Sequence, residues 1–288
     1  MIAMFQKELK SYFQSMTGYV YLAFFTIAIA VYYVYYCVIN AMTNFSSYVL
    51  GNVTIFLLIA VPILTMRLFA EEKKQRTDQL LFTAPVRTWE IVVGKYLASL
   101  ALYAISLVIV AIFPLITSMF GKVNWAMTLT GFLGAFLLGA GLIAIGLFIS
   151  CITEHQMVSA VLSFAIFLLM YMLPYLTDMF PSNKIFTLIV LLIGSALLAW
   201  LFFSETKDIK ITAVAGLIPA IASVVVYIWK PELYDNGIAN MISWLSLMDR
   251  FSNFVNGVLN VSSVVYDCSF VVVFLVIATE VLEHRRWK

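Results

Sequence analysis

Hydrophobic residues in this chain come in long uninterrupted runs that short polar segments separate. Eight runs lie at about residues 17–39, 49–68, 96–119, 127–150, 157–178, 185–203, 211–229 and 265–282. A bilayer core about 30 Å thick needs roughly 20 apolar residues per helix, and runs of that length favour helices over the alternating ten-residue segments of a barrel. The pattern therefore predicts an all-α, polytopic membrane protein with about eight transmembrane helices, built as a single transmembrane domain over residues 1–288.

The runs at 185–203 and 211–229 allow two interpretations, because only the polar segment 204–210 separates them. They form either two full spans or one partly re-entrant excursion. Each run is long enough to cross a bilayer, and Lys207 and Lys210 suit the inner surface, so we count them as two spans.

The first residues of the chain have a different pattern. Over residues 1–16 the apolar side chains recur at helical spacing on one face and polar side chains occupy the other, which predicts an amphipathic helix lying in the membrane interface. A frayed extension of the first span is the alternative. The apolar face consists of Ile2, Phe5, Leu9, Tyr12, Phe13 and Met16.

The distribution of charge orients these spans. If the N-terminus is cytoplasmic, only Lys122, Lys184, Lys230 and Arg250 of the 17 Lys and Arg residues lie outside, which leaves thirteen inside. The positive-inside rule then places both termini in the cytoplasm. Residues 230–264 become an extracytoplasmic loop, and helical spacing from Ile238 to Phe251 predicts a helix at the outer membrane surface.

Composition agrees with a membrane protein and excludes several functions. The chain is 63% hydrophobic and 11% charged, against roughly half and a quarter in soluble proteins. A net charge of +2 with scattered basic residues excludes nucleic acid as a partner, whereas the lipid bilayer is one. There is no phosphate-binding loop, and His155 and His284 are the only histidines, so we expect no bound cofactor, no metal site and no enzymatic activity.

Ionisable residues fall in loops or at the edges of the apolar runs. Carriers driven by an ion gradient usually hold such a residue at membrane depth, so the pattern disfavours that class of transporter. Gly131, Ala135 and Gly139, spaced four apart, predict close helix packing within the chain or across a dimer; a place in a transport path is the alternative. Tyr32, Tyr33, Tyr35 and Tyr36 indicate an interfacial belt or, alternatively, the lining of an outward cavity.

The segment Arg67–Lys95 is the long charged break in this hydrophobic pattern. We expect residues 68–83 to continue helically from the second run and Pro85 to end that helix. Thr88 is then expected to cap the next helix. The cytoplasmic loop proper spans residues 69–95.

Within this segment, FAEEKKQRTDQLLFTAPVRTWEIVVGKYLA (Phe69–Ala98) resembles the cytoplasmic loop between the second and third spans of ABC-2 type permeases, the membrane subunits of a class of ABC exporters. The matching positions are Glu71, Glu72, Lys73, Thr77, Leu80, Leu81, Ala84, Pro85, Gly94 and Lys95. Arg76 stands where the family usually has glycine. Residues 153–156 resemble a second family loop, and Leu245–Trp287 is similar to the end of the gliding-motility-associated subgroup.

This resemblance implies an exporter in the bacterial cytoplasmic membrane, with two membrane subunits and an ABC ATPase subunit dimer that holds the ATP and Mg. The second membrane subunit is another permease copy or a paralogue. The subgroup adds an auxiliary membrane protein with an extracytoplasmic domain. The expected ATPase-coupling residues are Glu71, Glu72, Arg76, Pro85, Arg87 and Glu154. An amphiphilic or lipid-like substrate is expected; the alternative is a membrane anchor or mechanotransmission subunit whose ATPase drives an extracytoplasmic protein.

Overall fold

The structure is a computed structural model that describes residues 1–77, 86–177 and 246–286, with scattered residues between 184 and 237. Contacts divide the chain into two compact units, Met1–Tyr171 with Leu247–Lys288, and Met172–Ser246. Most of the predicted spans 185–203 and 211–229 lies outside the described residues, so these two spans stay a prediction. The following description concerns the first unit.

The described residues form helices joined by short turns, and there is no strand among them. In chain order these are α1 (Ile2–Gln14), α2 (Met16–Tyr33), the π-helix η1 (Val34–Ile39), α3 (Phe45–Tyr48), the 3-10 helix η2 (Leu50–Asn52), α4 (Val53–Thr65), α5 (Ala70–Lys74), α7 (Thr88–Val110), α8 (Ile112–Phe120), α9 (Trp125–Ile152), α10 (Gln156–Thr177), α14 (Leu247–Val255) and α15 (Val261–Arg286).

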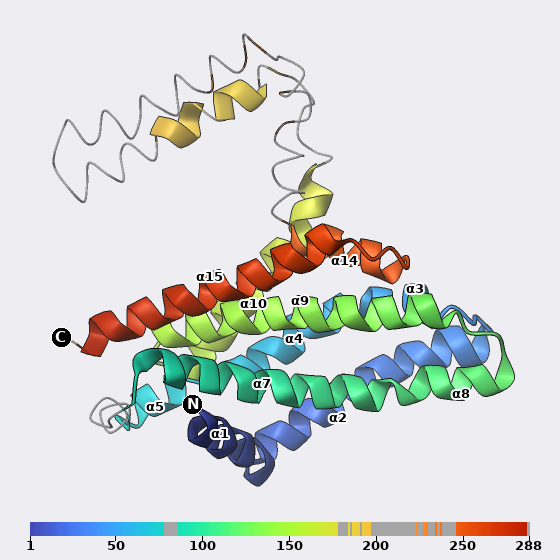
Figure 1. Ribbon diagram of the computed structural model, residues 1–288, viewed down its shortest axis with the longest axis horizontal. Coiled ribbons are helices and arrows are strands. Elements are labelled where there is room, and N and C mark those ends of the chain that lie inside the picture. The colour runs from blue at the N-terminus through green and yellow to red at the C-terminus, as the bar shows by residue number, and fades with distance from the viewer. Residues whose placement is uncertain are drawn as a thin grey trace. The chain divides into compact units, whose positions relative to one another are not determined.

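Six helical stretches of the described chain are long and apolar enough to cross a membrane. They are Met16–Ile39, Phe45–Lys74, Thr88–Phe120, Trp125–Ile152, Gln156–Tyr175 and Val261–His284. Each coincides with one of the predicted runs, so the helical, polytopic class is confirmed. Figure 1 shows α1, α5 and the C-terminal end of α15 at one end of the first unit, with α3 and the turn between α8 and α9 at the other.

Helix α9 forms the centre of the first unit. Within its most apolar window 72% of the residues are buried, against 17% for the spans that begin at Met16, Gln156 and Val261. Small residues allow this close packing: a Cβ on Gly139 would lie 2.2 Å from the Tyr103 ring, and one on Gly131 would lie 2.4 Å from Ser46 Oγ. The Tyr103 hydroxyl donates to the Ala135 carbonyl at 2.6 Å. The predicted stripe of small residues therefore lies against α3 and α7 of the same chain.

Helix α14 runs along α9. Near one end of α14, Phe254 approaches Gly134, and near the other, Leu247 approaches Gly141. These two glycines lie about 14 and 24 Å along α9 from Trp125, at a rise of about 1.5 Å per residue. α14 therefore lies lengthwise against α9, whereas a helix flat on the outer surface would meet only its end. The earlier part of the predicted surface helix, residues 238–245, lies outside the described residues.

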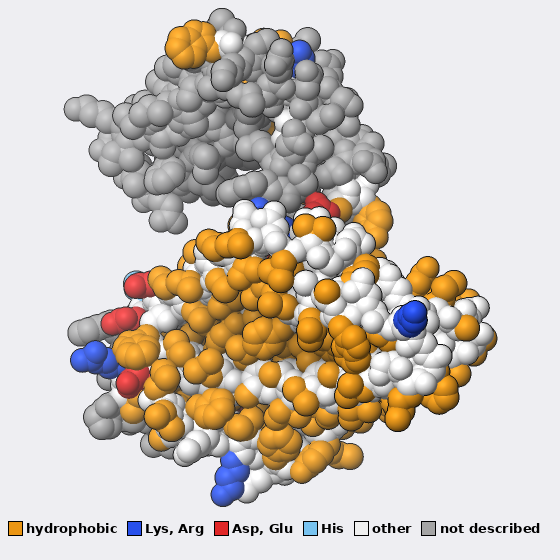
Figure 2. Space-filling model, turned by 45° about the vertical axis from the view of Figure 1, so that its right-hand side comes forward, with side chains coloured by type: hydrophobic (Ala, Val, Ile, Leu, Met, Phe, Trp, Pro, Cys, Tyr) orange, Lys and Arg blue, Asp and Glu red, His pale blue; other side chains and the backbone are white. Residues whose placement is uncertain are grey.

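The outside of the first unit is apolar. Val108, Val161 and Val272 are 70%, 62% and 58% exposed although they lie within predicted spans. Figure 2 shows hydrophobic side chains over most of the visible face of this unit, with most of the acidic side chains at one edge and basic side chains at several separate places. A broad apolar surface of this kind is what lipid chains would cover.

Candidate functional site

The charged segment begins at an elbow, Met66–Phe69, between α4 and α5. The backbone N–H groups of Phe69 and Ala70 donate to Ser150 Oγ on α9 at 3.0 and 3.2 Å. The Ser150 hydroxyl satisfies donors that would otherwise lack partners at the start of a helix. The expected continuous helix over residues 68–83 is therefore interrupted, and α5 ends at Lys74.

Helix α5 is also attached to the end of α9. Lys73 Nζ donates to the carbonyl of Cys151 and, at 3.4 Å, to the carbonyl of Thr153. A lysine suits this place, because carbonyl groups at a helix C-terminus lack internal partners and carry partial negative charge. Glu154 follows directly and is exposed. The two loops that the sequence singled out thus lie side by side.

Lys95 on α7 joins three segments of the chain. Its ammonium group lies 2.9 Å from Glu8 Oε1 of α1 and 2.9 Å from Glu72 Oε1 of α5. It also donates to the Leu68 carbonyl of the elbow at 2.7 Å. The side chain is only 1% exposed and lies 5.0 Å from the Phe69 ring centroid. The three N–H donors of the ammonium group thus match three acceptors, as a buried cation requires.

Lys7 completes this group, which we call the Lys95 cluster: Lys7, Glu8, Glu72 and Lys95. Lys7 Nζ lies 3.7 Å from Glu72 and 3.8 Å from Glu8, and its side chain is 62% exposed. The cluster therefore holds two cations and two carboxylates. Its charges balance, which lowers the cost of placing them near the membrane.

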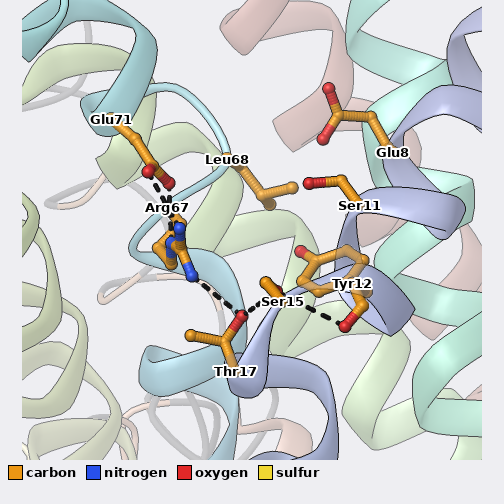
Figure 3. Close-up of a pocket in the computed structure, with 8 residues that line it drawn as sticks. All are labelled: Glu8, Ser11, Tyr12, Ser15, Thr17, Arg67, Leu68 and Glu71. Atoms are coloured by element: carbon orange, nitrogen blue, oxygen red, sulfur yellow. Dashed lines mark hydrogen bonds and ion pairs between the residues drawn. The ribbon is translucent and has the colours of Figure 1, made fainter.

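A second ion pair lies beside α1, near the Lys95 cluster. Arg67 forms a bidentate pair with Glu71, with nitrogen–oxygen distances of 2.6 and 2.8 Å, and donates to Thr17 Oγ1 at 2.9 Å. In Figure 3 these side chains surround a polar cavity of ≈ 40 Å³ beside Ser11 and Ser15. Since a water molecule needs roughly 10–15 Å³, the cavity has room for only a few waters.

Tyr12 attaches α1 to the end of α4. Its hydroxyl donates to the Leu64 carbonyl at 3.1 Å, near the end of α4. Burial raises the pKa of the Tyr12 phenol well above its ordinary value, so the hydroxyl keeps its proton and remains a donor. Tyr12 thereby links α1 to the second span as well as to the first.

Among the six expected ATPase-coupling residues, the structure separates an inner from an outer set. Glu71 and Glu72 are partly buried and make the internal ion pairs described above. Arg76, Arg87 and Glu154 are exposed. Pro85 lies outside the described residues. An exposed set and an internally paired set have different tasks, because only exposed side chains are accessible to a separate subunit.

Arg76 has an unusual backbone conformation. Its φ is +55°, in the left-handed region that glycine adopts without strain and other residues rarely adopt. The family that the sequence resembles usually has glycine at this position. The backbone at this position therefore has the conformation that glycine favours, although the residue here is arginine.

The second side of the charged segment begins at Arg87, which is the N-cap of α7. The Glu90 side chain accepts from the Arg87 backbone N–H at 3.4 Å, and the Glu90 N–H donates to the Arg87 carbonyl at 3.0 Å. Thr88 is the first helical residue and is buried, so the prediction that Thr88 caps α7 was wrong by one position. The Glu90 carboxylate satisfies the backbone N–H of the N-cap residue Arg87, as the acidic member of a capping box does.

Sequence reasoning missed the importance of Lys95, Glu8 and Lys7. On sequence grounds Lys95 is included only as part of the Gly94-Lys95 pair that resembles the family. A signal was available, because Lys95 has apolar residues on both sides, in IVVGKYLA, and a lysine in such a place requires a partner. The partner could not be identified, since Glu8 is 87 residues away in the chain.

A comparison with protein families matches residues 3–185 to a model described as ABC-2 family transporter protein. The matched residues are well over half of the chain, and they run from α1 through α10, including both sides of the charged segment. A comparison with curated proteins finds no match.

Proposed function

We propose that this chain, which belongs to the ABC-2 family of transporter proteins, exports an amphiphilic or lipid-like substrate. As a member of that family it is the membrane permease component of an ABC transporter and associates with an ABC ATPase subunit. It lies in a bacterial cytoplasmic membrane with both termini in the cytoplasm. A dimer of separate ATPase subunits holds the ATP and Mg. The chain itself binds no cofactor and contributes no catalytic residue.

The observation that carries the coupling role is an exposed charged surface on a firmly held segment. Lys74, Gln75, Arg76, Arg87 and Glu154 are exposed. Lys73 ties the segment to α9, Glu71 ties it to the elbow and Glu72 ties it to α7. In this proposal Arg76, Arg87 and Glu154 contact the ATPase directly. Glu71 and Glu72 contribute by holding the segment in position, and Pro85 ends its first half. Mixed charges suit an interface in which complementarity selects the partner.

The remaining partners belong to the proposal on sequence grounds. Leu245–Trp287 is similar to the gliding-motility-associated subgroup and lies outside the matched family region. It supports an auxiliary membrane protein with an extracytoplasmic domain. The second membrane subunit is another copy of this chain or a paralogue.

A charge-reversal experiment tests the ATPase contact. The permease is co-expressed with its ABC ATPase subunit, and the variant Arg76→Glu with Arg87→Glu is compared with Lys122→Glu. Lys122 is exposed at the opposite end of the first unit, between α8 and α9. We expect the double variant to retain at least about tenfold less ATPase on a permease affinity column, since reversed interface charges repel the partner.

The control variant should retain as much ATPase as the natural sequence. Equal retention by the double variant, at unchanged yield and melting temperature, would refute the assigned contact surface. Export itself is measured as ATP-dependent transfer of a fluorescent lipid in vesicles that contain both subunits. ATP hydrolysis without transfer across a range of amphiphiles would favour the anchor or mechanotransmission role instead.

A further inference from the structure

The Lys95 cluster connects the N-terminal helix to the proposed ATPase-coupling segment. One ammonium group, on α7, contacts a carboxylate of α1, a carboxylate of α5 and a carbonyl of the elbow. Helix α1 is far in sequence from the elbow and α5, which follow each other directly, and Lys95 is the buried cation that contacts all three. The exposed Lys7 adds a longer contact from α1 to Glu72. Removal of Lys95 would weaken the hold of α1 on α5 without changing the exposed surface at Arg76, Arg87 or Glu154.

The stability of the fold does not require such a cluster. Replacing a buried ion pair by apolar residues of similar size is often neutral or stabilising, because the charges recover only part of their lost hydration. What charges provide at such a place is a fixed relative position, since each hydrogen bond has a preferred length and direction. The geometry of Lys95 therefore indicates positioning of the three elements.

The backbone beside Lys95 is also shaped for α1. A Cβ on Gly94 would lie 3.0 Å from Met4 Cβ and 3.4 Å from the Met1 carbonyl. A larger residue would push α1 away from α7 and lengthen the contact between Glu8 and Lys95. Gly94 and Lys95 therefore act together, the first by permitting close approach and the second by fixing the position.

Helix α1 leads directly into the first span. Only Ser15 separates α1 from α2, and the Ser15 hydroxyl lies 2.6 Å from Thr17 Oγ1. Arg67 of the elbow donates to the same Thr17 oxygen. A displacement of α1 must therefore move the start of α2, because no flexible linker lies between them.

We propose that Lys95 is a positioning residue that holds α1, the elbow and α5 as one rigid body with the start of α7. A movement that the ATPase imposes on α5 then reaches the first span through α1, in addition to the second span through the elbow and the third through α7. The source of that movement rests on the proposed function. The rigid body itself does not depend on it.

The test measures the separation of α1 and α5 with spin labels. Gln6 and Gln75 are exposed residues of α1 and of the turn after α5, so Gln6→Cys with Gln75→Cys carries the labels. The natural cysteines Cys37, Cys151 and Cys268 are first replaced by alanine. The full chain in lipid nanodiscs should give one narrow distance distribution.

Three changes at the cluster are then compared in that background. Lys95→Met removes the buried partner of two carboxylates and can fail to fold. The informative variant is therefore Glu8→Gln with Glu72→Gln and Lys95→Met, in which only the exposed Lys7 loses its carboxylate partners. We expect this triple variant to fold and to give a clearly broader distribution. Lys95→Arg preserves a cation and should keep the distribution narrow. A narrow distribution in the triple variant, or a broad one in the natural sequence, overturns the proposal.

A second measurement separates this proposal from the proposed function. The triple variant keeps the exposed Arg76, Arg87 and Glu154 but changes Glu72, which helps to hold the coupling segment in position. Transfer is therefore compared at equal amounts of bound ATPase. The ATP-dependent transfer of the triple variant should fall about tenfold, within the range usual for energetic coupling between two sites. Unchanged transfer overturns the transmission role. If the natural permease binds no ATPase, the proposed function fails, while the spin-label result still decides whether Lys95 holds α1 to α5.

Discussion

The two ends of the first unit are held together by different kinds of interaction. At the end that contains α5, the contacts between segments are charge-paired hydrogen bonds, from Lys95 to Glu8 and Glu72 and from Arg67 to Glu71. At the opposite end, aromatic rings stack. Three stacked pairs lie there, and their ring centroids are 4.9 Å apart in Tyr33 and Phe113, 6.0 Å in Phe45 and Phe132, and 5.5 Å in Tyr36 and Tyr48.

The difference shows how a membrane bundle can be stiff at one end and adaptable at the other. A charge-paired hydrogen bond fixes both distance and direction, and breaking it leaves a buried charge without a partner. Stacked rings tolerate sliding and tilting, because their attraction depends weakly on direction. Relative motion of spans is therefore easier to accommodate near Tyr33 and Tyr36 than near Lys95. The π-helix η1 carries Tyr35 and Tyr36 at this adaptable end.

The largest effect on stability is expected when the buried cation is removed from the end that contains α5. Lys95→Met leaves Glu8 and Glu72 close together with only the exposed Lys7 as a shared cation. We expect it to lower the free energy of unfolding by about 3–5 kcal/mol, as is usual when one member of a buried ion pair is removed. Reversible unfolding in mixed micelles measures the change. The exposed Lys122→Met should alter the free energy by less than about 0.5 kcal/mol, and equal effects would remove the distinction.

An intermediate effect is expected at the aromatic end. Tyr33→Leu keeps an apolar side chain at a buried position but loses the stacking on Phe113, whose ring is inclined by 14°. The loss should be about 0.5–1.5 kcal/mol, the usual worth of an aromatic pair beyond its buried area. Melting temperature at low and high salt gives the measurement. A marked salt dependence would show that electrostatic contacts also hold this end.

The smallest effect concerns the backbone at Arg76. Arg76→Gly removes a side chain from a residue at φ +55°, a conformation that costs a residue with a Cβ about 1 kcal/mol. Since glycine also gains freedom in the unfolded chain, the net stabilisation should be below about 1 kcal/mol. A small rise in melting temperature together with weaker ATPase retention would separate the backbone role of this position from that of its charge. A fall in melting temperature contradicts this account of the strain.

The apolar runs and the amphipathic repeat in the sequence were enough to locate most of the described helices. The six described spans and α1 follow directly from apolar runs and from the amphipathic repeat in residues 2–14. The interruption at Met66–Phe69 could not be predicted, because it depends on Ser150 of α9. Arg67 and Glu71 are four residues apart, a spacing at which a local ion pair can be read from the sequence. The pairing of Glu72 with Lys95 could not be predicted, because it depends on how α5 and α7 meet.

The sequence by itself determined that this chain crosses a membrane, where its helices run, and which charged segment interrupts them. Those properties depend on the local cost of burying backbone and charged groups in lipid, which each stretch of residues carries on its own. Tertiary structure decided which of those charges face outward and which pair within the protein. Lys95 illustrates the reason, because its role depends on Glu8, Leu68 and Glu72, which only the packing of α1, α5 and α7 brings within hydrogen-bond distance.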